Sequence, residues 1–194
     1  MKFEIFKLKS VTSTNDEAVN FIKNKKTEIG CVYAETQTKG RGTQGKRWIS
    51  EEGNLFGSIF FPLKKEYPPF NEFSIINPVL ISKVIEKFCS EKKITLKWPN
   101  DVFIEGKKIC GILQETIVNN NTKFLIIGIG INLTTSPYVN PNYRTTSIFE
   151  ETKKKLTNKE IINLLVESYE KFFVNLNMYN FSNFKIKADL MAVN

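Results

Sequence analysis

The chain has 194 residues, of which 41% are hydrophobic and 25% are charged, and these values are ordinary for one globular domain with a substantial core. It contains no histidine, which excludes serine–histidine and cysteine–histidine nucleophilic mechanisms, histidine-ligated zinc and imidazole as a general base. The net charge of +8 is compatible with nucleic-acid binding, but the lysines are scattered along the chain, which favours an ordinary solvated surface.

The chain shows no sign of export or membrane insertion. No apolar run approaches the length that crosses a bilayer, and residues 1–4 do not begin a signal peptide. The three cysteines are odd in number and form no CxxC pair, which favours a reducing compartment. We therefore expect a single cytoplasmic domain, residues 1–194, that does not contact membranes.

The first half of the chain predicts three strands and two helices. A strand is expected at residues 3–6, followed by a helix that begins after residues 13–15 and ends near residues 24–26. Strands are predicted at residues 30–35 and 55–62, with a glycine-rich basic loop between them. After two consecutive prolines, apolar residues at helical spacing predict one long amphipathic helix over residues 73–88.

The second half predicts an antiparallel sheet followed by helices. The expected strands are residues 94–98, 102–104, 109–118 and 123–131, with tight turns at residues 105–107 and 119–121. A polar loop over residues 134–147 leads to a helix capped by Thr157 or Asn158, and a short helical tail follows from Phe181. The predicted class is α+β, with a mostly antiparallel sheet and helices packed on one face.

The basic loop after the second predicted strand contains three glycines, Gly40, Gly42 and Gly45, whose spacing matches the dinucleotide-binding fingerprint. No helix follows the loop, so its context excludes a Rossmann fold. Bare backbone surrounded by cations suits a phosphate-bearing ligand, and a mobile basic turn is the alternative. The cations of this loop are Lys39, Arg41, Lys46 and Arg47.

Further polar residues lie at predicted strand ends or in loops, where binding sites gather. Ser13, Thr14 and Asn15 have a simpler explanation as an ordinary helix N-cap. Asn100 could reach a phosphate, and Asp101 could orient a substrate amine or hold Mg²⁺. A turn in which both side chains bond their own backbone explains that pair equally well.

Two glycines interrupt the apolar strand at residues 123–131. Gly128 and Gly130 cost stability there, and such glycines usually mark a close approach by a ligand or by another chain segment. Strand alternation places them on one sheet face with Asn132, and Lys108 at the start of a neighbouring strand could hold an ammonium over that face. A packing role for the glycines is the alternative, but the combination with Asn132 favours a binding site.

Taken together, these motifs resemble those of biotin protein ligases. The resemblance covers roughly residues 8–175, and five motifs in one order are far more specific than any single one. It implies the class II synthetase-like catalytic domain of the biotin/lipoate ligases. The motifs are Ser13-Thr14-Asn15, Glu35-Thr36-Gln37-Thr38-Lys39-Gly40-Arg41-Gly42, Lys97-Trp98-Pro99-Asn100-Asp101, Lys108-x-x-Gly111-Ile112-Leu113-x-Glu115 and Gly128-x-Gly130-x-Asn132.

The resemblance implies an ATP-dependent biotin–[biotin carboxyl carrier protein] ligase. Biotin and MgATP would form biotinyl-5′-AMP and pyrophosphate, and the biotinyl group would then pass to one lysine of a biotin carboxyl carrier protein of acetyl-CoA carboxylase or a related carboxylase. The nucleophiles would be the biotin carboxylate and the carrier lysine. An enzyme without histidine can supply position and charge neutralisation for both steps.

The same resemblance assigns roles residue by residue. The implied catalytic residues are Arg41, Lys108 and Asp101, with Asp101 also a Mg²⁺ ligand. The implied biotin-binding residues are Ser13, Thr14, Asn15, Gln37, Gly40, Arg41, Lys108, Gly111, Gly128 and Gly130. The implied ATP-binding residues are Gly42, Lys46, Arg47, Trp48, Asn100 and Asn132, with Trp48 closing over the ligand as the loop orders.

Two departures from the family pattern bear on these roles. Thr43 stands where relatives usually carry a second arginine, and a hydroxyl cannot make a bidentate phosphate contact. The chain also ends soon after its last predicted helix, whereas relatives typically add a small C-terminal domain and some carry an N-terminal DNA-binding domain. We therefore expect no DNA repression. Homodimer formation stays open at this point.

Three other functions are compatible with the sequence. A lipoate or octanoate transferase shares the fold, although an apolar acyl chain needs fewer polar residues where Ser13, Thr14, Asn15 and Gln37 stand. Octanoyl transferases also use a cysteine with histidine, and this chain has no histidine. A non-catalytic basic binding module would use the +8 charge, but no stacking platform for bases is evident. A regulatory relative without turnover is the third.

Overall fold

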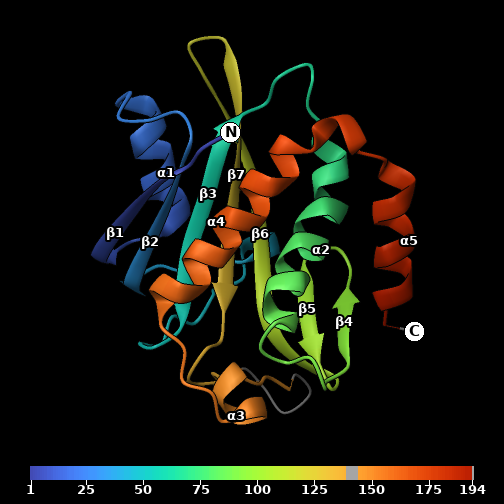
Figure 1. Ribbon diagram of the computed structural model, residues 1–194. Coiled ribbons are helices and arrows are strands. Elements are labelled where there is room, and N and C mark those ends of the chain that lie inside the picture. Colours follow the sequence, from blue (N-terminus) through green and yellow to red (C-terminus); the bar gives the residue numbers. More distant parts are fainter. Residues whose placement is uncertain (139–143, 194) are drawn as a thin grey trace.

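The computed structural model describes residues 1–138 and 144–193, so residues 139–143 of the predicted loop at 134–147 lie outside the described residues. Seven strands form one mixed sheet in the order β1-β2-β3-β7-β6-β5-β4 (Figure 1). Their bounds are β1 Glu4–Val11, β2 Gly30–Gln37, β3 Leu55–Pro62, β4 Ile94–Lys97, β5 Asp101–Ile104, β6 Lys107–Asn119 and β7 Thr122–Ile131.

The sheet is mostly antiparallel, as predicted. Only β1 and β2 pair in parallel, joined through helix α1 (Thr14–Lys23), and every other strand pair of the described chain is antiparallel. β1 is longer than the sequence indicated, because its lysines at an exposed sheet edge mask the apolar pattern. The turn between β6 and β7 has Asn120 and Asn121 at positive φ, which suits a two-residue hairpin.

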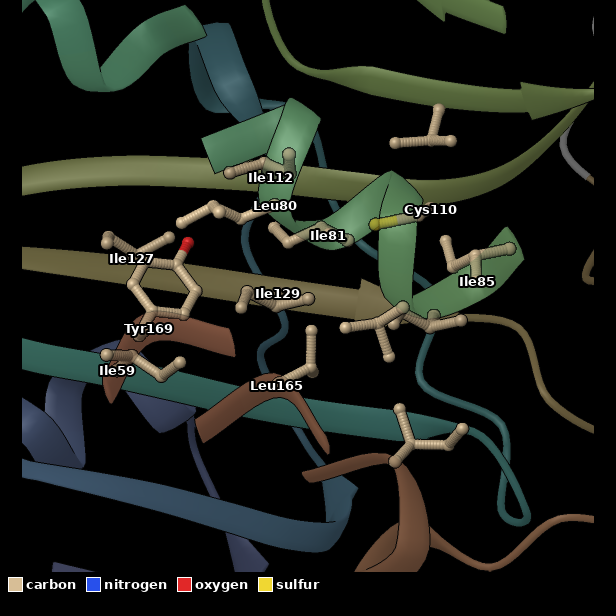
Figure 2. Close-up of a cluster of buried hydrophobic side chains, with 14 of the residues drawn as sticks. Ile59, Leu80, Ile81, Ile85, Cys110, Ile112, Ile127, Ile129, Leu165 and Tyr169 are labelled. Carbon is tan, nitrogen blue, oxygen red and sulfur yellow. The ribbon is translucent and has the colours of Figure 1, made fainter. Parts of the chain in front are cut away.

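Three long helices cover one face of the sheet (Figure 1). They are α2 (Phe73–Glu86), α4 (Asn158–Val174) and α5 (Phe181–Met191), and the five-residue helix α3 (Ile148–Thr152), which the sequence did not predict, precedes α4. In the main core, Ile127 and Ile129 of β7 pack with Leu165 and Tyr169 of α4 (Figure 2). None of the described helices combines the length and apolarity needed to cross a membrane.

Helix α1 packs on the opposite face. Its apolar residues Ala18, Phe21 and Ile22 form a second, smaller cluster with Phe60 and Phe124, among others. The prediction of helices on one face therefore holds for α2, α4 and α5 but not for α1. The reason is strand alternation, since Phe60 and Phe124 point away from the main core. Beyond α1 this second face has no α-helical cover within the described chain, and the candidate site lies there.

One buried asparagine fixes the segment that follows β7. Asn54 Oδ1 accepts hydrogen bonds from the backbone N–H groups of Leu133 at 2.9 Å and Thr134 at 3.0 Å, and its Nδ2 donates to the Thr135 carbonyl at 3.0 Å. We expect Asn54→Ala to lower the free energy of unfolding by about 2–4 kcal/mol, because it leaves several backbone groups without a partner. Urea denaturation measures this loss. The exposed Asn20→Ala is the matched control, and an equal effect of both variants would contradict the assignment.

Candidate active site

Two adjoining cavities lie on the sheet face beside α1. The first, of about 50 Å³, has the start of α1 and Gln37 at one end and Gly111, Gly128 and Gly130 on its floor. The second, of about 270 Å³, lies toward the basic loop and the segment after β7. Gly42, Trp48 and Lys108 line both cavities. The two cavities therefore form one cleft, and the side chains of Trp48 and Lys108 are the partition between them.

The first cavity ends in a polar network in which Thr14, Asn15 and Ser58 are buried and Gln37 and Ser50 are partly buried. The Thr14 backbone N–H donates to Gln37 Oε1 at 2.8 Å, and Gln37 Nε2 donates to Ser50 Oγ at 3.1 Å. Ser58 Oγ lies 2.8 Å from Thr14 Oγ1 and 2.5 Å from Asn15 Oδ1. Several donors and acceptors are therefore fixed at one end of the cavity, where they can hydrogen-bond a polar ring.

The floor of the cleft is bare sheet backbone. Gly111 of β6 and Gly130 of β7 stand opposite each other in the sheet, and Gly128 lies further along β7. A Cβ atom at Gly128 would lie 2.5 Å from Asn15 Oδ1, and one at Gly111 or Gly130 would lie 2.5 Å from the Trp48 ring. Any side chain at these positions would collide with the groups above them. This close approach explains why the chain has glycine at all three positions.

Trp48 rests on this floor and fills much of the first cavity. Its ring covers Gly111 and Gly130, and Lys108 Nζ lies 5.2 Å from the ring centroid. Trp48 Nε1 is the buried side-chain polar atom that has no hydrogen-bond partner in the described part of the chain. A cofactor-sized ligand needs a few hundred Å³, more than the about 50 Å³ of the first cavity, so a ligand of that size can occupy this part of the floor only if Trp48 moves. Closure of Trp48 over a ligand stays a prediction.

The basic loop that carries Trp48 is a tight hairpin. The Gly42 N–H donates to the Lys46 carbonyl at 2.7 Å, and the Trp48 N–H donates to the Gly40 carbonyl at 2.9 Å. Gln44 and Gly45 at its tip have positive φ. Gly40 does not line either cavity. It packs against the Trp48 carbonyl and Gln37, and so builds the base of the loop.

The Arg41 guanidinium is held by two carboxylates. Its nitrogens donate to both oxygens of Glu115, at 3.0 and 2.9 Å, and to Asp16 at 2.8 Å. Glu115 also accepts from Asn15 Nδ2 at 2.7 Å. The predicted phosphate-binding arginine therefore lines the first cavity but is paired with acids, which tie the loop to α1 and β6.

Lys108 stands at the partition between the cavities. Its Nζ lies 2.7 Å from Asp101 Oδ1, and both side chains are only 14% exposed. Asn100 Nδ2 donates to the same Asp101 oxygen at 3.1 Å and lies 3.5 Å from Thr43 Oγ1. A partly buried ammonium is therefore available to anionic groups in either cavity.

A model of the biotin/lipoate A/B protein ligase family matches residues 6–132, well over half of the chain. The chain belongs to this family. Among individual relatives, the bifunctional ligase/repressor BirA of Escherichia coli K12 is 33% identical over 125 residues, which cover 63% of this chain and 38% of that protein. The biotin–[acetyl-CoA-carboxylase] ligase of Paracoccus denitrificans is 27% identical and covers 88% of this chain and 73% of its own length.

Solved structures of biotin protein ligases share the fold of this family member. The Leishmania major enzyme in complex with biotinyl-5-AMP superposes with a TM-score of 0.84 at 25% identity, covering 98% of this chain and 81% of that chain. The Aquifex aeolicus enzyme in complex with biotin and ATP gives 0.80 at 29% identity, covering 98% and 78%. The chain thus spans most of these structures but only 38% of the Escherichia coli protein.

In this ligase-family chain, the second cavity brings together most of the predicted nucleotide-binding residues. Asn100 lines the first cavity instead. Asn132 is almost fully buried and its Nδ2 donates to the Thr146 carbonyl at 3.0 Å, so this amide also shapes the cavity wall. The predicted residues that line the second cavity are Gly42, Lys46, Arg47, Trp48, Asp101, Lys108 and Asn132.

Sequence reasoning missed several residues of the site. Ser58 is the one side chain in β3 with a polar group, and that exception in an apolar strand was an available signal. Glu115 belongs to one of the family motifs, but its contacts with Asn15 and Arg41 depend on the tertiary fold. Ile49, Pro137 and Thr145 line the second cavity from loops that gave no signal.

The cysteines take no part in this site. All three are free and buried, and burial raises the pKa of the Cys110 and Cys31 thiols well above the ordinary value. Cys110 lies close to Lys108 in sequence, but its side chain belongs to the main core on the opposite sheet face (Figure 2). These buried thiols are poorly placed to act as nucleophiles, unlike the cysteine of octanoyl transferases.

No group of three or more potential metal ligands occurs among the cysteines, aspartates and glutamates of the described chain. Asp101 therefore stands as a single carboxylate paired with Lys108 rather than as part of a metal-binding cluster. One carboxylate can still assist a magnesium ion that is held mainly by substrate phosphates and water.

Proposed function

We propose that this protein activates biotin with ATP to form biotinyl-5′-AMP and then transfers the biotinyl group to a lysine of a biotin carboxyl carrier protein. The observation that carries this proposal is the divided cleft, with a hydrogen-bonding end, a glycine floor and Lys108 at the partition. The complexes of related ligases with biotin, ATP and biotinyl-5-AMP support it. We place this reaction in the cytoplasm.

In the first step, a biotin carboxylate oxygen forms a bond to the α-phosphorus of ATP, and the bond from that phosphorus to the oxygen of pyrophosphate breaks. Both reactants are anionic, so their approach needs positive charge near the reacting atoms. Lys108 lines both cavities and supplies one ammonium there. Lys46 and Arg47 add charge along the second cavity, where the phosphates would lie.

In the second step, the carrier lysine attacks the acyl carbon of biotinyl-5′-AMP and AMP leaves with the electrons of the broken C–O bond. The attacking amine must be neutral, and its proton is lost as the amide forms. Asp101 lies beside Lys108 at the cleft and is our candidate to orient that amine. The Paracoccus denitrificans relative is named for acetyl-CoA carboxylase, which favours a carrier of that enzyme or a related carboxylase.

Mg²⁺ would arrive with ATP. It commonly binds through substrate phosphates and one or two carboxylates. Asp101 offers one carboxylate at the second cavity, and the Asn100 amide that donates to it lines the first cavity. When bound, the ion would neutralise phosphate charge. The cations Lys46, Arg47 and Lys108 of this chain would add to that neutralisation.

A lipoate ligase is the nearest alternative within the family. The hydrogen-bonded network of Thr14, Asn15, Gln37 and Ser58 favours biotin, because a polar site rejects a ligand that cannot form hydrogen bonds with it. Isothermal titration calorimetry with biotin and with lipoic acid separates the two ligands. Tight binding of biotin with at least about 100-fold weaker binding of lipoic acid is the expected result. The reverse preference would replace the proposed substrate.

Thr43 offers a test of how firmly the adenylate is held. Thr43 lines the second cavity, and we expect Thr43→Arg to slow release of preformed biotinyl-5′-AMP by about 10-fold, because guanidinium can bind phosphate in a bidentate manner. A chase experiment with labelled adenylate measures the rate. Gln44→Arg adds the same charge one residue away, outside both cavities, and should have a smaller effect. Equal release from Thr43→Arg and the unmodified protein would refute the idea.

A further inference from the structure

Glu115 connects the two polar elements of the first cavity without lining the cavity itself. It lies on β6, and its side chain is 32% exposed. One carboxylate oxygen accepts from Asn15 Nδ2 at 2.7 Å and from Arg41 Nη2 at 2.9 Å, and the other accepts from Arg41 Nη1 at 3.0 Å. The same carboxylate therefore fixes a residue of α1 and a residue of the basic loop.

The Asn15 amide is held in one orientation by groups on both sides. Its Nδ2 faces two acceptors, Glu115 and the Leu113 carbonyl at 3.4 Å, and its Oδ1 faces the Ser58 hydroxyl at 2.5 Å. Asn15 is only 2% exposed, and its Oδ1 sits directly over Gly128. Reversing the amide would turn its oxygen toward a carboxylate and a carbonyl, an arrangement of three acceptors without a donor.

We propose that Glu115 is a positioning residue that keeps the Asn15 oxygen available as a hydrogen-bond acceptor in the ligand pocket. This inference rests on the proposed function. The ureido ring of biotin carries N–H donors as well as a carbonyl acceptor, and an N–H group needs an acceptor where Asn15 Oδ1 stands. Ser58 can rotate its hydroxyl toward other partners, whereas the Asn15 amide can serve the ligand only in the orientation that Glu115 sets.

A second consequence concerns Arg41. Glu115 binds both terminal nitrogens of Arg41, and Asp16 binds one of them again at 2.8 Å. These contacts place the guanidinium at the cavity rim before a ligand arrives. A preorganised cation does not have to be ordered when an anionic group binds beside it. Glu115 thus orders both Asn15 at the polar end of the pocket and Arg41 at its rim.

The test is a double-mutant cycle on biotin affinity, measured by calorimetry on the full chain. We expect Glu115→Gln to weaken biotin binding about 10-fold or more, because an amide offers only one acceptor oxygen to Asn15 and Arg41 together. In an Asn15→Ala background the same substitution should weaken binding by less than about 3-fold, since Asn15 is gone and Asp16 still holds Arg41. A general loss of packing, or an effect through Arg41 alone, would produce equal losses in both backgrounds.

Two further variants keep the result decisive. Glu167→Gln removes an exposed carboxylate that pairs with Lys171 on α4, and it should leave biotin affinity unchanged. If Glu115→Gln does not give a cooperative thermal transition, Glu115→Asp withdraws the carboxylate by one methylene and should show the same dependence on Asn15.

The two proposals fail in different ways. If the unmodified protein does not bind biotin, the proposed function is wrong. If it binds biotin and Glu115→Gln binds equally well, or loses the same affinity with and without Asn15, only the role of Glu115 is wrong.

Discussion

Replacing Lys108 by alanine should reduce the rate of biotin-dependent ATP–pyrophosphate exchange by about 100- to 1,000-fold, the usual effect of removing one preorganised charge-stabilising group. The Lys108 ammonium lies at the partition between the two cavities, 2.7 Å from Asp101. In the proposed reaction, negative charge gathers there as carboxylate and phosphate approach each other. Biotin affinity should fall by less, about 10-fold, because the polar end of the pocket is left intact.

The control for this experiment is Lys123→Ala, which removes an exposed lysine from β7. It changes the net charge equally and should leave exchange unchanged. Lys108→Arg adds a stricter comparison, since it keeps the charge but not the compact ammonium, and it should recover only part of the rate. Exchange by Lys108→Ala within about 3-fold of the unmodified rate would contradict the assigned role.

The second large effect is expected from Gly128→Ala, which should weaken biotin binding at least about 30-fold through displacement of a buried hydrogen-bonding group. The new Cβ would lie 2.5 Å from Asn15 Oδ1 and 3.1 Å from Asn15 Cγ. Asn15 cannot move aside freely, because Ser58 and Glu115 hold its amide on both sides. Calorimetry with biotin measures the loss.

Gly106→Asn is the control for this glycine. Gly106 lies in the turn between β5 and β6 at a φ of +73°, and a Cβ atom added there would meet no atom within 4 Å. Asparagine tolerates that backbone conformation, so this variant should bind biotin as the unmodified protein does. Biotin affinity of Gly128→Ala within about 3-fold of normal would show that Asn15 does not need its present position.

The sequence predicts those parts of the fold in which the local pattern of apolar residues matches the burial of the element in the structure. The continuous apolar run of β7 and the helical spacing in α2 and α4 are examples. The edge strand β1 was underestimated because its lysines interrupt the apolar pattern, and α3 is too short to show a period. The placement of α1 on the other sheet face depends on which strand residues it meets, and that is a tertiary property.

The candidate site divides in the same manner. Gly128 and Gly130 stood out because glycine is unfavourable within an apolar strand. Lys108 stood out because it lies at the start of the neighbouring strand. Their assembly with Gln37 and Trp48 into one cleft follows from strand pairing. The role of Glu115 was not predictable, since its two partners lie 100 and 74 positions away in the chain. Thr145 reaches the second cavity through a β-bridge with Lys108, which sequence spacing does not reveal.

The most direct test of the proposed activity is ATP–pyrophosphate exchange by the unmodified protein, measured with and without biotin. We predict incorporation of labelled pyrophosphate into ATP only when biotin is present, because in the proposed reaction the carboxylate of biotin is the nucleophile that makes the adenylate. Lipoic acid in place of biotin should give little exchange. Absence of biotin-dependent exchange above background would contradict the proposed activation of biotin by ATP.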